Sequence, residues 1–269
     1  MGWTPVIGVP QGMKPFRVDF SHAFEGAIEH KGYRLAWSRA ARCPCSSPAD
    51  TDQADPLCTL CKGRAWLYFG PPGYQIDEAV VGTLDPVQRA YLERTGACVI
   101  HGIMSSLGLR TDDTTELGPW MRDDSRAMVT VRAENKLGYY DRLMNLDAEI
   151  GFTQVVEVPE SGLETETRYP VRQVLLARTL DKQMFEGEHF TLVAGKIVWI
   201  ASQKPAAKAR VALYYLTHPT WLVVDYPNAF RATLQNKKLG KKASTPDGEP
   251  IPLPVRAHVQ YEFVPRTTT

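Results

Sequence analysis

Residues 190–200 read FTLVAGKIVWI, and this stretch gives the clearest indication of the fold. Two runs rich in Val, Ile, Leu and Trp flank Ala194-Gly195, which predicts two strands joined by a tight turn into a hairpin. Runs of the same kind recur through the C-terminal half, at 171–179, 188–193, 196–201, 211–217, 220–226 and 255–264. Short runs at this spacing, with Gly and Pro turn signals between them, predict a mainly β protein built as an antiparallel barrel or sandwich.

The composition is that of an ordinary globular protein. Of 269 residues, 43% are hydrophobic and 23% are charged, which excludes wholesale disorder. Lys and Arg number 31 against 30 Asp and Glu, a net charge of +1, and this balance argues against a protein that wraps DNA with a large basic surface. No stretch approaches the ~20 apolar residues of a membrane span, and the first residues, MGWTP, do not resemble a secretory signal. We therefore expect a protein folded in a reducing cytosol, with no membrane partner.

Four of the five cysteines lie close together in the spacing C-x-C-x12-C-x2-C. The intervening residues 46–57 are rich in Ser, Pro, Asp and Thr, so they offer no core of their own and something must fasten the two ends of this loop. Four thiolates can hold Zn²⁺ in a tetrahedron with no open position, which makes such a site structural rather than catalytic. We predict a structural zinc site on Cys43, Cys45, Cys58 and Cys61.

Other interpretations of these cysteines remain open at this point. Two disulfides or unligated thiols would use the same residues, and an iron–sulfur centre would use the same ligands. His30 is a candidate to replace one weak cysteine ligand. The fifth cysteine, Cys98, lies in the apolar stretch ACVI (97–100), where it is expected to pack in the core.

The sequence divides into four regions. They are an N-terminal arm with a short helix (1–32), a zinc-binding loop region (33–75), a mixed, β-rich region (76–160), and a β-barrel or sandwich region with a long Lys-rich loop (161–269). Apolar residues recur every four positions from Phe16 to Ile28, which predicts an amphipathic helix there. A second short helix is predicted over 86–95, ended by Gly96.

Catalytic motifs are missing from the sequence: there is no P-loop, no dinucleotide-binding glycine pattern, no G-x-S-x-G and no H-E-x-x-H. We expect no enzymatic activity and assign no catalytic residues. Asp141, Asp147 and Glu149 could form a carboxylate cluster that binds a divalent cation. Ordinary salt links, for example from Asp141 to Arg142 or Arg132, are the alternative interpretation.

One lysine run is a candidate contact for nucleic acid. Lys237, Lys238, Lys241 and Lys242 could neutralise phosphates and are the candidate DNA-facing residues. Because Ala, Ser and Thr follow them rather than aromatic residues, no stacking platform accompanies them. A solvated surface loop is the alternative.

Several short motifs stand in an order that is similar to one family. They are RCPC (42–45), CTLCKGR (58–64), WLYFG (66–70), GYYDRL (138–143), RYPV (168–171), KIVW (196–199), Tyr215 and HPTW (218–221). Together they resemble the head-to-tail connector (neck or head-closure) proteins of tailed bacteriophages.

The resemblance implies a structural virion protein with a β-barrel body, assembled in the host cytoplasm as a homo-oligomeric ring around the DNA channel. Its partners would be copies of itself, neighbouring portal, adaptor or tail proteins, and transiently the packaged DNA. No catalytic residues come with the family. Tail-terminator, tail-tube or baseplate membership remains open, and the alternative of another class is a zinc-containing module that binds nucleic acid.

Overall fold

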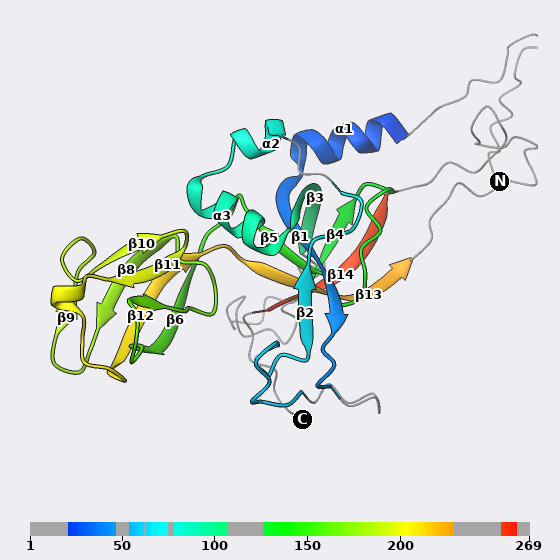
Figure 1. Cartoon of the computed structure of the whole chain (residues 1–269). Helices are drawn as coiled ribbons and strands as arrows, with labels where there is room; N and C mark the ends of the chain where they lie inside the picture. Colours follow the sequence, from blue (N-terminus) through cyan, green and yellow to red (C-terminus); the bar gives the residue numbers. More distant parts are fainter. Residues whose placement is uncertain are drawn as a thin grey trace, which may run out of the picture.

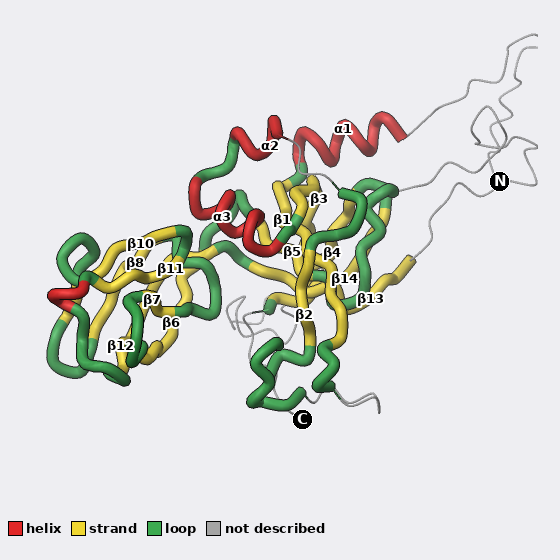
Figure 2. The backbone as a smooth tube through the Cα atoms, in the orientation of Figure 1, coloured by secondary structure: helices red, strands yellow, loops and turns green. Residues whose placement is uncertain are grey.

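The computed structural model describes residues 21–46, 54–61, 63–74, 78–106, 126–228 and 254–262. Within these ranges the chain is mainly β, with a few short helices (Figures 1 and 2). Its strands form a closed barrel and, beside it, a smaller two-sheet sandwich. The predicted fold class, a mainly β protein with short helices and a cysteine loop, is confirmed.

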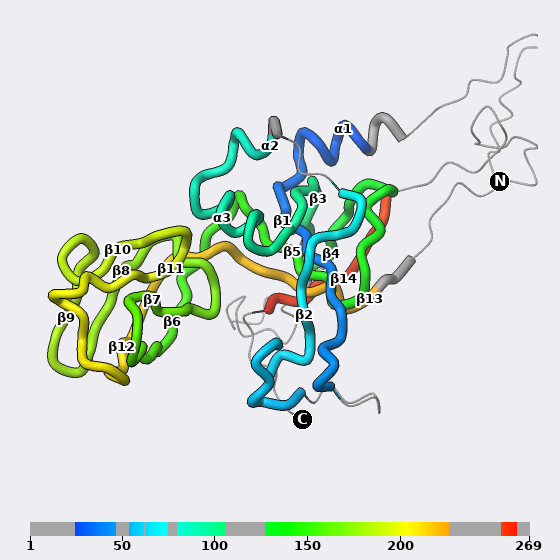
Figure 3. Tube along the Cα trace, in the orientation of Figure 1, coloured from blue at the N-terminus to red at the C-terminus, as the bar shows by residue number. Residues whose placement is uncertain are grey.

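Six antiparallel strands close the barrel. In spatial order they are β1 (Tyr33–Arg42), β3 (Cys98–Ser106), β4 (Arg126–Val131), β14 (Val255–Tyr261), β13 (Thr220–Asn228) and β5 (Arg142–Asn145). Closure is complete because β5 pairs back onto β1, from Leu35↔Asn145 to Ser38↔Arg142. Figure 3 shows the consequence: blue, green, orange and red segments, far apart in the sequence, lie side by side.

The barrel interior is filled by inward-facing side chains from every strand. They are Leu35, Trp37, Cys98, Ile100, Ala127, Val129, Val131, Leu143, Val223, Ala257 and Val259, joined by Leu137 from a loop. Alternation with a period of two produces this core: in β14, Ala257 and Val259 are buried, whereas Arg256 is exposed. The prediction that Cys98 packs in the core is confirmed.

The sandwich is inserted between the barrel strands β5 and β13. One of its sheets has the order β6 (Ile150–Glu157), β12 (Arg210–Thr217), β8 (Gln173–Arg178) and β9 (Gln183–Met184). The other has the order β10 (Phe190–Val193), β11 (Lys196–Trp199) and β7 (Glu164–Thr165), and a 3₁₀ turn, η1 (Ala201–Gln203), follows β11. A single apolar core that includes Tyr169, Trp199 and Tyr215 lies between the two sheets.

The hairpin predicted at Ala194-Gly195 is formed by β10 and β11. Val193 pairs with Lys196 across a two-residue turn. Both turn residues have positive φ, 51° for Ala194 and 77° for Gly195. Such a turn matches the right-handed twist of the flanking strands, which explains why so short a connection suffices.

The structure divides the chain differently from the four sequence regions. β13 and β14, which fall in the predicted 161–269 region, belong to the barrel, whereas the strands from β7 to β12 belong to the sandwich. The physical reason is the insertion: the chain leaves the barrel after Asn145 and returns at Pro219, where the Asn145 N–H donates to the Pro219 carbonyl at 2.9 Å. This adjacency depends on contacts remote in sequence.

Among the described residues, three α-helices lie on the barrel side of the molecule: α1 (Ser21–Lys31), α2 (Glu78–Gly82) and α3 (Pro86–Thr95). The helix predicted over 86–95 is confirmed as α3, with Gly96 in the left-handed conformation after its last turn. α1 overlaps the helix predicted over 16–28, of which residues 16–20 lie outside the described residues. None of the helices in the described ranges has the length and apolar character needed to cross a bilayer.

Two backbones cross closely at Gly70, just after β2 (Trp66–Phe69), and we expect Gly70→Ala to destabilise the fold. An added Cβ would lie 2.0 Å from the Gly96 carbonyl oxygen, so one of the two backbones must move, at a cost of about 1–3 kcal/mol. Urea denaturation measures the change. Gly26→Ala in α1 is the matched control: its Cβ meets nothing within 4 Å, and a gain of about 0.5–1 kcal/mol is expected there. Equal stabilities of the two variants would contradict this account.

Candidate metal centre

Pairing of β1 with β2 brings the two cysteine pairs together. The ladder runs from Arg39↔Phe69 to Arg42↔Trp66. One further bond, from the Cys43 N–H to the Ala65 carbonyl at 2.7 Å, extends it by a residue. The first cysteine pair therefore follows the end of β1 and the second precedes the start of β2, at the same end of the barrel (Figure 1).

The four thiols converge on one point. All four Sγ atoms lie within 4.8 Å of one another. The Sγ atoms of Cys43 and Cys58 are 3.7 Å apart, and those of Cys45 and Cys61 are 3.4 Å apart. Sulfur atoms at about 2.3 Å from a tetrahedral zinc ion would be about 3.8 Å from each other, so this arrangement fits one such ion. In the part of the chain that the structure describes, no other group of three or more His, Cys, Asp or Glu side chains is placed to hold a metal.

The backbone around the cysteines is folded into tight turns that present the sulfurs inward. Gly63 has φ of 76°, and Ala65 adopts φ of 65°, a conformation that costs a residue with a side chain some energy. The Arg64 N–H bonds to the Cys61 carbonyl at 3.0 Å, and the Ser46 N–H to the Cys43 carbonyl at 2.9 Å. In the described part of the loop, these turns direct the cysteine side chains toward one another.

Proton affinities differ within the cluster. Burial raises the pKa of Cys45 to about 12, and neighbouring thiols add to this rise. Burial also acts to raise the pKa of Cys61, but hydrogen bonds from Cys45, from the Ala65 backbone and from the other thiols lower it to about 6. The thiolate is the form of cysteine that ligates a metal, so the lowered pKa of Cys61 favours metal binding at this sulfur.

An aromatic stack joins the cysteine loop to the barrel. The ring of Trp66 in β2 lies parallel to that of Tyr140, with centroids 4.5 Å apart and 13° between the planes, and the guanidinium of Arg42 lies over the Trp66 ring at 5.6 Å. Tyr140 takes a left-handed φ of 64°, and its N–H donates to the Val223 carbonyl at 2.7 Å. Nothing in the local sequence GYYDRL (138–143) indicates that Tyr140 contacts β2, because the two segments are far apart in the chain.

The three carboxylates considered as a cation site do not come together. Asp141 is 1% exposed and accepts hydrogen bonds from the Trp37 indole at 2.7 Å and from the Ala40 N–H at 3.0 Å. Asp147 pairs with Arg34, and Glu149 lies 3.1 Å from the Nε of another arginine. Each carboxylate is occupied by its own donors, so the structure favours the salt-link interpretation.

The particular salt links differ from the predicted ones. Asp141 pairs with Arg39 at 3.2 Å, rather than with Arg142 or Arg132. Arg142 instead forms a largely buried pair with Glu262 at 2.9 Å. The reason is the barrel geometry: β1 places Arg39 beside Asp141, while the side chain of Arg142 reaches the residue that follows β14.

The candidate DNA-facing residues Lys237, Lys238, Lys241 and Lys242 lie outside the described residues. His30, considered as a substitute ligand, is exposed in α1 and does not belong to the metal-binding group.

Comparison with known proteins does not assign the chain to a family. The chain matches no protein-family model, and no curated protein is significantly similar to it. The four-cysteine cluster is the chemically most specific site in the described part of the chain.

Proposed function

We propose that the protein is a non-enzymatic structural protein whose cysteine loop is held by one Zn²⁺ on Cys43, Cys45, Cys58 and Cys61. The observation that carries this proposal is the convergence of the four sulfurs within 4.8 Å. That space suits a single ion, whereas bridging sulfides and several irons would hold the cysteine sulfurs farther apart. Four sulfur ligands leave no position for a substrate, which favours a structural role.

The proposal extends to a place in the neck of a tailed phage, as a ring subunit of the head-to-tail connector. Its support is the order of the motifs quoted above, together with a β-barrel body that carries a metal-stapled loop outside its core. The sandwich adds large apolar side chains at the surface, among them Val155, Leu180 and Phe185 with exposed fractions of 62%, 92% and 51%. These side chains would be buried if neighbouring subunits pack against the sandwich. A net charge of +1 lets copies pack together without strong repulsion.

The expected result is a ring-sized assembly that carries about one zinc per chain. Light scattering coupled to size exclusion gives the mass of the purified, reduced protein, and elemental analysis gives its metal content. A monomer whose affinity for DNA falls steeply with salt would overturn the connector in favour of the nucleic-acid-binding module. A ring that is found in a purified tail or baseplate fraction, and not in the neck, would move the protein to one of those structures.

A further inference from the structure

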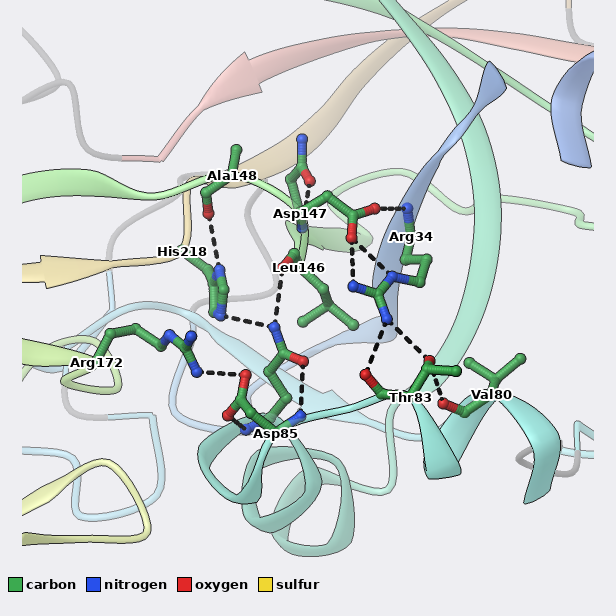
Figure 4. A network of polar contacts seen from close by, with 11 residues as sticks. Arg34, Val80, Thr83, Asp85, Leu146, Asp147, Ala148, Arg172 and His218 are labelled. Carbon is green, nitrogen blue, oxygen red and sulfur yellow. Dashed lines mark hydrogen bonds and ion pairs between the residues drawn. The ribbon is translucent and has the colours of Figure 1, made fainter. Parts of the chain in front are cut away.

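The joint between barrel and sandwich contains a buried histidine in a network of polar contacts (Figure 4). Two connecting segments cross the joint, 146–149 outward and 218–219 back. The N-terminal end of α3 lies against both of them, as its contacts with Leu146 and His218 show. His218 is 3% exposed, so its ring is largely shielded from solvent.

Both ring nitrogens of His218 have partners that suit only the neutral side chain. Nδ1 lies 2.8 Å from the Ala148 carbonyl, which can only accept, so Nδ1 carries the proton. Nε2 lies 3.2 Å from the side-chain nitrogen of Gln88, which can only donate, so Nε2 accepts. A second proton, on Nε2, would face the N–H donor of Gln88.

Gln88 is held in this orientation by its other contacts. Its amide nitrogen also donates to the Leu146 carbonyl at 2.9 Å, and its oxygen accepts from the Asp85 N–H at 3.2 Å in the capping box of α3. Turning the amide over would break both bonds. Gln88 thus caps α3 and contacts both connecting segments, 146–149 through Leu146 and 218–219 through His218.

Charged groups surround the joint on the sandwich side. Arg172, which precedes β8, pairs with Asp85 at the start of α3 and lies 3.1 Å from Glu149. The charges that face His218 are therefore one cation, Arg172, and two anions, Asp85 and Glu149.

We propose that His218 is an acid-sensitive latch of this joint. Uptake of a proton on Nε2 breaks the contact with Gln88, loosens the start of α3 from residues 146–148, and allows the sandwich to change its orientation relative to the barrel. The latch is a property of the joint itself and depends on neither the zinc site nor the connector role.

The direction of the pH effect follows from burial. Burial lowers the pKa of His218 below its ordinary value of about 6.5, and Arg172 adds to this, whereas the Ala148 carbonyl, Asp85 and Glu149 oppose it. The closed joint therefore binds fewer protons than the open one. Its stability is fully present above about pH 6.5 and is lost as the pH falls toward the lowered pKa. Each unit of lowering corresponds to about a tenfold change in the opening equilibrium.

Hydrogen exchange of the full-length protein tests the latch. We expect amides in 87–95 and 146–149 to exchange faster, by up to about tenfold, at about pH 5.5 than at about pH 7.5, once the intrinsic pH dependence is removed. His218→Asn keeps a donor for the Ala148 carbonyl but cannot take up the proton, so the acid effect should disappear. His258→Asn is the matched control, because His258 pairs with Asp225 at the surface of the barrel, and this variant should keep the effect.

A second variant covers the case in which His218→Asn does not fold. Gln88→Glu places a carboxylate opposite Nε2, which stabilises the protonated ring and should shrink or reverse the acid effect. Loss of the effect in whichever variant folds, with its retention in His258→Asn, supports the latch. An unchanged acid effect in that variant, or no effect in the wild-type protein, overturns it.

Discussion

Replacing Cys61 by serine is expected to abolish zinc binding at the cysteine cluster and to loosen the turns around the other three cysteines, while the barrel stays folded. Cys61 is 3% exposed and contributes one of four ligands, so its loss leaves an open, poorly ligated site. With Zn²⁺ bound as proposed, the metal would supply much of the stability of this segment, since structural zinc contributes on the order of 10 kcal/mol in small zinc domains. Zinc per chain should fall from about one to near zero. Trypsin should then cut after Arg42 and Arg64 faster than in the wild-type protein.

Cys98→Ala provides the matched control for this result. Cys98 is also buried, but it packs in the barrel interior, away from the cluster. The Cys98→Ala variant should bind zinc and be cut by trypsin at the loop as the wild-type protein is. Its free energy of unfolding should fall by only about 1 kcal/mol, as expected for a small truncation in the core. Wild-type zinc content in Cys61→Ser would show that the cluster is not the metal site.

Local patterns in the sequence predict the parts of this fold that depend on neighbouring residues. Alternation in 255–263 predicts which positions of β14 face inward, and Ala257 and Val259 are fully buried. The turn at Ala194-Gly195 is confirmed because its conformational requirement is local. The convergence of the cysteines is predictable for a similar reason: their spacing already requires a loop whose two ends meet.

The features of the fold that the sequence does not predict depend on tertiary contacts. Closure of the barrel depends on β5 pairing with both β1 and β13. Neither pairing can be inferred from the sequence pattern of the strands themselves. The insertion of the sandwich is invisible for the same reason. Likewise His218 reads as an ordinary histidine in HPTW, since its partners Gln88 and Ala148 come from distant segments.

Asp141→Ala should be among the most destabilising single substitutions in the barrel. The Asp141 carboxylate is buried and accepts from the Trp37 indole, the Ala40 N–H and Arg39. Alanine would leave these donors unsatisfied and one arginine without its partner, at a cost of about 3–5 kcal/mol. Urea denaturation followed by tryptophan fluorescence measures the loss, and the signal of Trp37 itself should change in the native state.

Asp147→Ala distinguishes this buried role from a general effect of losing a carboxylate. Asp147 also pairs with an arginine, Arg34, but both side chains are over a quarter exposed, so water can replace the lost contacts. The expected cost is about 1 kcal/mol. Asp141→Asn should fall between the two, because it keeps an acceptor oxygen for Trp37 but loses the charge that faces Arg39. If Asp141→Ala were no less stable than Asp147→Ala, the carboxylate of Asp141 would not be what holds β1 to the turn before β5.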